Sequence, residues 1–198
     1  GLQPFLHVGT DIWCVHTPIL DTVNNRDILE RVQEGKEVWW YVNYAPPRPY
    51  ANFFMDFAAI EHRILFWQTW ALGLRGMYYW GVNIAAEGQN PWQGQLDVTP
   101  ANGDGFLVYP SANGPVNSIR WEVIRDGIDD YDYLVLLHEG IRRLREQGGR
   151  QALLDKAQKA YNIGQLVPNL VTFPRDPAML EAKRGEIARV LVELQSKQ

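Results

Sequence analysis

Two segments decide the fold: V-W-W-Y-V-N-Y-A-P-P-R-P-Y-A-N at residues 38–52 and G-M-Y-Y-W-G-V-N at residues 76–83. Both are rich in β-branched and aromatic residues, and they flank an apolar helix pattern of about five turns, which is typical of a βαβ unit. Each predicted strand ends in a group of Trp, Tyr and Asn residues. Ligands bind at the carboxyl ends of the strands in parallel α/β folds, so we expect a binding site at this edge of the sheet.

The side chains at these strand ends suit a sugar ring. Aromatic faces provide a surface for its C–H groups, and amides between them can hydrogen-bond to its hydroxyls. Alternation along a strand sends Trp40 to one side of the sheet and its two neighbours to the other, and the sequence leaves open which side faces a ligand. We predict a carbohydrate pocket to which this region contributes Trp39, Trp40, Tyr41, Asn43, Tyr79, Trp80 and Asn83.

The remaining pattern predicts alternating strands and helices, followed by helices alone. A buried strand is expected at residues 5–16, a helix at 26–34 capped by Asn25, and a strand at 37–44. Apolar residues at spacings of three and four then predict a helix that Asp56 caps, before a strand at 77–80. After a long loop at residues 83–117, helices are expected from Ser118 to about residue 146, at 149–161 and at 176–195. Loops of this length in compact domains are usually functional.

This order of elements predicts an α/β fold with a parallel sheet and right-handed crossovers. Three parallel strands are too few to close a barrel, and purely parallel sheets are normally covered on both faces. We therefore expect the C-terminal portion of a (β/α)8 TIM barrel, about three βα units, followed by extra C-terminal helices. Residues 1–146 would form the barrel part and residues 147–198 a helical extension packed on it. A small three-layer α/β domain is the alternative.

Composition narrows the classes of function. Aromatic residues make up 12% of the 198 residues, with 8 Trp, and this excess favours a stacking surface because a buried indole N–H needs a partner. The net charge of −4 argues against a nucleic-acid partner, and no apolar run is long enough to span a membrane. A single cysteine, Cys14, and scattered histidines without a ligand spacing predict no metal site and no other cofactor.

A family resemblance is carried by N-P-W at 90–92 and by four longer segments. They read E-V-W-W-Y-V-N-Y-A-P-P-R-P-Y-A-N-F-F-M-D at 37–56, R-I-L-F-W-Q-T-W-A-L-G-L-R-G-M-Y-Y-W-G-V-N at 63–83, D-G-F-L-V-Y-P at 104–110, and S-I-R-W-E-V-I-R-D-G-I-D-D-Y-D-Y-L at 118–134. Together they resemble the C-terminal catalytic-domain region of glycoside hydrolase family 123. The resemblance implies a (β/α)8-barrel glycosidase that cleaves β-linked N-acetylgalactosamine by a substrate-assisted, retaining mechanism. There the 2-acetamido oxygen attacks the anomeric carbon, while an adjacent Asp-Glu pair steadies the acetamido nitrogen and protonates the leaving oxygen.

The chain contains no Asp-Glu dipeptide, so the catalytic acid is expected outside it and no catalytic residue is assigned. At the end of the first strand, Asp11 is the carboxylate best placed for the pocket and Trp13 is a further sugar-binding candidate. Trp92 in the long loop is a candidate lid. We interpret Asp129 and Asp130 as part of a solvated helix surface. The long loop offers further carboxylates to a sugar hydroxyl: Glu87, Asp97 and Asp104.

The partners expected are therefore a glycan or glycoconjugate and the rest of the barrel, supplied by an earlier segment or another chain. A non-catalytic carbohydrate-binding or structural module is the alternative to a hydrolase part. The first residues, Gly-Leu-Gln-Pro, contain no signal peptide, and we expect an extracellular or periplasmic location in a bacterium.

Overall fold

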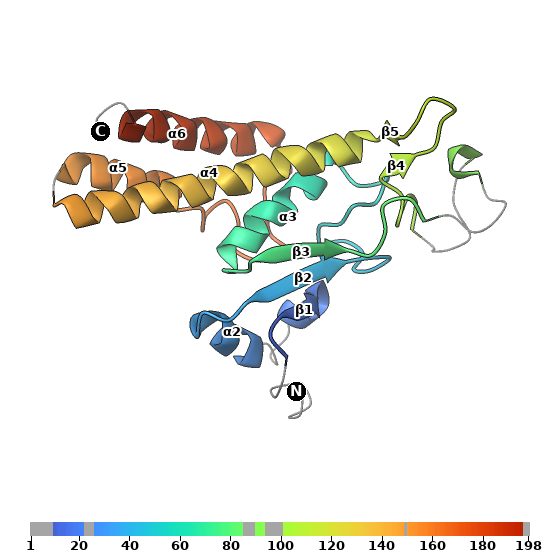
Figure 1. The fold of residues 1–198 in the computed structure, drawn as a ribbon, viewed down its shortest axis with the longest axis horizontal. Helices are drawn as coiled ribbons and strands as arrows, with labels where there is room; N and C mark the ends of the chain where they lie inside the picture. Colours follow the sequence, from blue (N-terminus) through green and yellow to red (C-terminus); the bar gives the residue numbers. More distant parts are fainter. Residues whose placement is uncertain (1–9, 22–25, 85–89, 94–100, 149, 196–198) are drawn as a thin grey trace.

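The computed structural model describes residues 10–21, 26–84, 90–93, 101–148 and 150–195. Its centre is a three-stranded sheet in the order β1-β2-β3, formed by Trp13–His16, Val38–Val42 and Gly76–Tyr79. Both strand pairs are parallel, with Trp13 opposite Val38 and Trp39 opposite Gly76. The parallel sheet with its helical crossovers confirms the prediction of an α/β fold (Figure 1).

Three helices connect the strands and cover one face of the sheet. α1 (Thr17–Leu20) and α2 (Arg26–Gln33) join β1 to β2, and α3 (Ala59–Ala71) joins β2 to β3. On this face β2 carries three side chains that are at most 1% exposed: Val38, Trp40 and Val42. The same buried cluster contains one apolar side chain from each helix: Leu20, Ile28 and Ile64.

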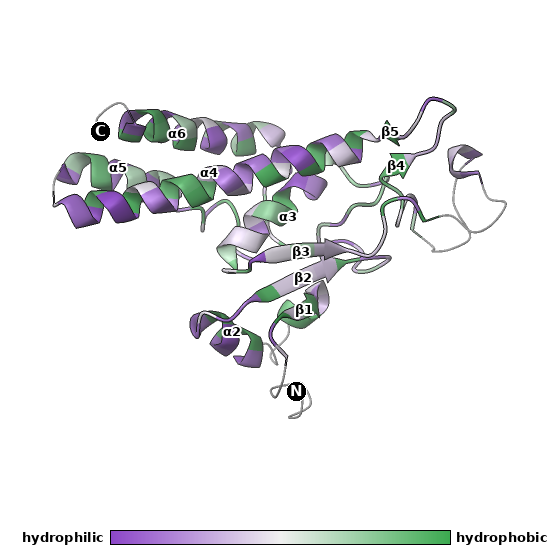
Figure 2. Cartoon of the chain, in the orientation of Figure 1, coloured by the Kyte–Doolittle hydropathy of each residue, from purple (hydrophilic) through white to green (hydrophobic). Residues whose placement is uncertain are grey.

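The C-terminal helices form a further layer beyond α3 (Figure 1). α4 (Ile119–Gln147) packs against α3, and α5 (Gln151–Tyr161) and α6 (Pro177–Gln195) pack against α4 and against each other. Ser118 caps α4 as predicted, because its Oγ accepts a hydrogen bond from the Trp121 N–H at 3.2 Å. In Figure 2, hydrophobic and hydrophilic residues alternate along all three helices, as expected of helices with one apolar side. No helix within the described ranges is long and apolar enough to cross a membrane.

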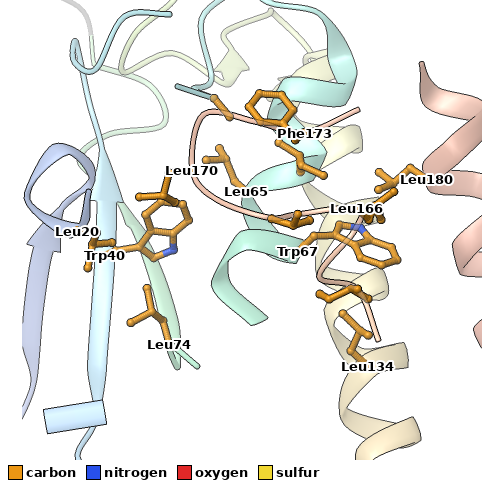
Figure 3. Close-up of a cluster of buried hydrophobic side chains, with 14 of the residues drawn as sticks. Leu20, Trp40, Leu65, Trp67, Leu74, Leu134, Leu166, Leu170, Phe173 and Leu180 are labelled. Atoms are coloured by element: carbon orange, nitrogen blue, oxygen red, sulfur yellow. The ribbon is translucent and has the colours of Figure 1, made fainter. Parts of the chain in front are cut away.

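One apolar core joins the sheet to the C-terminal helices (Figure 3). Trp40 projects from β2 into this core, and its indole N–H donates to Thr69 Oγ1 at 2.9 Å. Trp67 of α3 is also fully buried, and it lies among leucines from α4 and the C-terminal segments: Leu134, Leu166 and Leu180. The described residues of the C-terminal extension, 150–195, therefore share the core of the preceding part of the chain.

A buried ion-pair cluster ties α3, α4 and α6 together. Asp130 of α4 is completely buried and accepts hydrogen bonds from Arg63 Nε at 2.6 Å, Arg63 Nη2 at 3.0 Å and Trp67 Nε1 at 2.8 Å. Arg184 Nε of α6 lies 3.1 Å from Asp130 Oδ1. The interpretation of Asp130 as a solvated residue is therefore wrong, whereas its neighbour Asp129 is exposed as predicted. The cationic partners of Asp130 come from helices that are distant from it in the sequence.

Two local predictions also need correction. α3 begins at Ala59 and not directly after Asp56; the Ala58 N–H donates to the Glu61 carboxylate at 3.3 Å, and Asp56 accepts from Asn102 at 2.8 Å. The loop at residues 83–117 contains the short helix η2 (Pro91–Gln93) and an antiparallel hairpin of β4 (Val108–Tyr109) and β5 (Val116–Asn117). The predicted cap Asn25 lies outside the described residues.

Candidate functional site

One face of the three-stranded sheet is not covered by any helix among the described residues. Because side chains alternate along a strand, the face opposite α3 carries Cys14, His16, Trp39, Tyr41, Gly76 and Tyr78. We call this surface the uncovered face. Tyr78 is 47% exposed there, whereas Trp40 on the helix-covered face is completely buried.

Three side chains form a row across the carboxyl end of the uncovered face. His16, Tyr41 and Tyr78 are direct neighbours in the strand register. The ring centroids of His16 and Tyr41 are 4.9 Å apart, and those of Tyr41 and Tyr78 are 6.3 Å apart with the rings edge-on. Within the described part of the chain, neither tyrosine hydroxyl makes a hydrogen bond. We call these residues the aromatic row; it offers ring surface and two hydroxyls to a ligand.

Trp39 occupies the amino-terminal side of the uncovered face. Its indole lies over Gly76 on the neighbouring strand, where an added Cβ would come within 2.5 Å of the ring. The indole N–H donates to the Glu37 carboxylate at 2.7 Å, just before β2 begins. Glycine at position 76 therefore allows this ring to lie against the sheet, away from the aromatic row.

The loop after β2 is held in shape by two asparagines. Asn43 Oδ1 accepts from the Ala45 N–H at 2.9 Å, and the Asn43 N–H donates to the Ala45 carbonyl at 2.9 Å. The buried Asn52 donates to the carbonyls of Asn43 at 3.0 Å and Pro46 at 3.1 Å. His16 Nε2 lies 3.2 Å from the Ala45 carbonyl, so this loop is joined to the aromatic row. Asn43 thus lies at the predicted edge, where its amide oxygen is used by the loop itself.

The end of β3 is anchored by Asp104 from the long loop. Asp104 Oδ1 accepts from the Tyr79 hydroxyl and from Trp80 Nε1, both at 2.9 Å, and the Gly105 N–H donates to the Tyr79 hydroxyl at 2.7 Å. Burial, and then the Asp104 charge, raise the pKa of the Tyr79 hydroxyl. The phenol therefore keeps its proton and donates to the carboxylate at neutral pH. Tyr79 projects to the helix-covered side, so it positions the loop and does not join the aromatic row.

Trp80 packs against the backbone of this same loop. Gly105 has a φ of +73°, and a Cβ placed on it would lie 2.5 Å from Trp80 Cζ2. A positive φ and this close approach both require glycine at position 105. The Trp80 ring is half-buried and its N–H is engaged, so only the remaining part of its ring surface can meet a ligand.

Asn83 and Trp92 lie farther out along the same loop. Asn83 forms an isolated bridge with Phe106 and lines a cavity of about 400 Å³. Trp92 is 56% exposed, and its indole N–H donates to the Pro110 carbonyl at 2.8 Å. Glu87 and Asp97 lie outside the described residues.

Three predicted pocket residues lie away from the aromatic row. Trp40 packs in the core beneath α3, because alternation turns it to the helix-covered face. The described strand β1 begins at Trp13, so Trp13 and the exposed Asp11 lie at the amino end of the sheet, and residues 5–9 of the predicted strand lie outside the described residues. The backbone carbonyl of Asp11 accepts from Arg31 of α2, whose guanidinium stacks on Trp13. Neither residue can face a ligand at the carboxyl end.

His16 and Tyr78 were missed by the sequence reasoning. Both could have been found, because each stands beside Tyr41 once the three strands are aligned in parallel. In the described ranges no group of three His, Cys, Asp or Glu side chains is placed to hold a metal ion. The described carboxyl end of the uncovered face is thus aromatic and hydroxyl-bearing, which suits binding of a neutral polyol.

A protein-family model matches the part of the chain that carries the aromatic row. The model of the glycoside hydrolase 123 catalytic domain matches residues 6–137, which is more than half of the chain and includes all three strands and most of α4. A comparison with curated proteins gave no match.

Proposed function

The chain belongs to glycoside hydrolase family 123. On that premise we propose that its uncovered face is one wall of an active-site pocket, in which the glycosidic bond of a β-linked N-acetylhexosamine, namely N-acetylgalactosamine, is cleaved. The observation that carries the proposal is the aromatic row. It lies at the carboxyl ends of parallel strands, where α/β enzymes bind their ligands. His16, Tyr41 and Tyr78 combine ring faces with hydroxyls that have no described partner.

A (β/α)8 barrel accounts for a sheet that is covered on one face only. In such a barrel the helices surround the strands, and the inner face is closed by the other strands. In the described structure, β1 and β3 are edge strands, and edges of parallel sheets are seldom left open. We infer that the remaining strands come from an earlier segment or from another chain, and that the uncovered face is the interior wall.

The residues described here would bind and orient the sugar, and the proton donor would come from the remaining strands. A substrate-assisted mechanism needs one carboxyl function as acid, because the acetamido oxygen replaces the protein nucleophile. The aromatic row would stack on the sugar ring, and the two tyrosine hydroxyls would hydrogen-bond to its hydroxyls. A water-poor aromatic wall also favours a retained proton on a nearby carboxylic acid.

The proposal is tested by assaying the full-length protein on p-nitrophenyl N-acetyl-β-galactosaminide and on p-nitrophenyl β-galactoside. We expect release of nitrophenol from the first compound only, because the second lacks the acetamido group that attacks the anomeric carbon. Equal rates on both would exclude substrate assistance. A well-folded protein that releases nitrophenol from neither compound would refute the proposed activity.

A non-catalytic glycan-binding module is the second candidate. One observation favours it: the strand positions on the uncovered face include no Asp or Glu. Binding of N-acetylgalactosamine to the full-length protein without any turnover would support this second function over hydrolysis.

A further inference from the structure

A second cavity lies outside the uncovered face, and it is lined by residues of η2, β4, β5 and the starts of α3 and α4. Its volume is about 760 Å³, which is within the usual range for small-molecule sites of roughly 300–1,000 Å³. None of its lining residues belongs to β1, β2 or β3. The residues that carry the argument come from six different segments: Asp56, His62, Trp92, Asn102, Tyr109 and Arg120.

One wall of this cavity is a fixed aromatic pair. The rings of Trp92 and Tyr109 are 4.8 Å apart and inclined at 42°. The Trp92 indole N–H is tied to the Pro110 carbonyl at 2.8 Å, and the Tyr109 hydroxyl accepts from Arg120 at 3.2 Å. A Trp ring that is 56% exposed and yet held in place loses little conformational entropy when a ligand stacks on it.

Polar groups also line the cavity. His62 is only 3% exposed, and its Nε2 lies 3.0 Å from the Phe54 carbonyl, which assigns the ring proton to Nε2. His62 Nδ1 is therefore an acceptor, and it is buried without a partner in the described residues. Asp56 is exposed at the rim and is joined to Asn102 at 2.8 Å. The Asp56 carboxylate and the Asn102 amide of the lining therefore offer hydrogen-bonding groups that suit the hydroxyls or the amide of a ligand.

The charges around the cavity favour a neutral ligand. Arg120 is the cation in the lining, and its Nη1 atom donates to the carbonyls of Phe53 and Gly103, each at 2.7 Å. Its Nη2 atom donates to the Phe106 carbonyl and to Tyr109. These bonds leave little donor capacity for an anion. Burial, with the nearby Arg120 charge, lowers the pKa of His62 to about 4, so that ring is uncharged at neutral pH.

We propose that this cavity is a second saccharide site, in which a neutral sugar ring stacks on Trp92 and hydrogen-bonds to the polar side chains Asp56 and Asn102 of the lining. The site goes beyond the hydrolase proposal, because it would hold a sugar unit apart from the uncovered face. A glycosidase with such a site could anchor a branched or extended glycan while another unit is cleaved.

The test is a titration of the isotope-labelled full-length protein, monitored by NMR at the Trp92 indole and the His62 imidazole. The probes are N-acetylgalactosamine and methyl β-galactoside, with glycerol and sulfate as controls. We expect saturable shifts of both signals with at least one sugar, with a Kd in the millimolar range typical of a single ring. Trp92→Ala, read at His62, should weaken binding at least tenfold.

The matched control is Trp121→Ala, because Trp121 is a partly exposed α4 tryptophan outside the cavity lining. It should leave the affinity unchanged. The proposal is overturned if no sugar moves either signal in the folded wild-type protein, or if Trp92→Ala weakens binding by less than tenfold. Because the measurement needs no turnover, its failure is distinct from a failure of the hydrolase assay.

Discussion

Replacing Asp130 by alanine should destabilise the chain strongly. The carboxylate is completely buried, and it is contacted by Arg63, Trp67 and Arg184 at distances of 2.6–3.1 Å. Removing one partner of a buried ion pair costs about 3–5 kcal/mol, because the remaining charge stays buried without compensation. The Trp67 N–H would also lose its acceptor, at about 1–3 kcal/mol, although the two effects share one site and do not simply add.

We therefore expect a loss of about 3–5 kcal/mol in the free energy of unfolding, measured by urea denaturation, and a fall of roughly 1–2 M in the midpoint. Asp130→Asn should cost less, because the amide keeps one acceptor and the side-chain volume. The matched control is Asp129→Ala at the exposed neighbouring position, which should change stability by less than about 0.5 kcal/mol. Equal stabilities of the Asp129 and Asp130 variants would refute the structural role assigned to the cluster.

Three further predictions concern pH, loop packing and the aromatic row. The folded pKa of His62 is about 4 and its ordinary value is 6.5, so the unfolded state binds the proton more tightly. The free energy of unfolding should therefore fall by about 2 kcal/mol from pH 7 to pH 5. The variant His62→Gln should lack this dependence of stability on pH. Gly105→Ala should lower the melting temperature, at a cost of roughly 1–3 kcal/mol, because its Cβ would meet the Trp80 ring; calorimetry on the folded variant checks this, and an unchanged transition would contradict the packing. Tyr78→Ala in the full-length protein should reduce kcat/KM for the aryl N-acetylgalactosaminide by roughly 10- to 100-fold, the equivalent of about 1.4–2.7 kcal/mol. Tyr44→Ala, at an exposed loop position, should leave kcat/KM unchanged.

The elements with strong periodicity were predictable from the sequence. The two quoted segments became β2 and β3, and Ser118 marks the start of α4 because its hydroxyl can cap only a helix that begins directly after it. The start of α3 was misplaced, since the carboxylate that reaches back to the helix terminus is Glu61 and not Asp56. The strands β4 and β5 have two residues each, which is too short for alternation to be visible.

The site was harder to predict because it depends on contacts between distant residues. Trp40 and Tyr41 have similar chemistry, and only the position of α3 decides that Trp40 is buried and Tyr41 faces outward. The burial of Asp130 depends on Arg63, which lies 67 positions away in the sequence. Local composition therefore indicated which residue types meet at the strand ends, and the packing of the helices decides which of them remain available.

The length of α4 matters when the protein is attached to a solid support. With 29 residues, the helix extends for about 43 Å, and Arg120 at its beginning holds the loops near the second cavity. α6 runs beside α4 and ends at Gln195, at the opposite end of the molecule from β4 and β5 (Figure 1). A linker to a bead or sensor chip placed at Gln195 would leave the strand ends directed away from the support and accessible to large glycans.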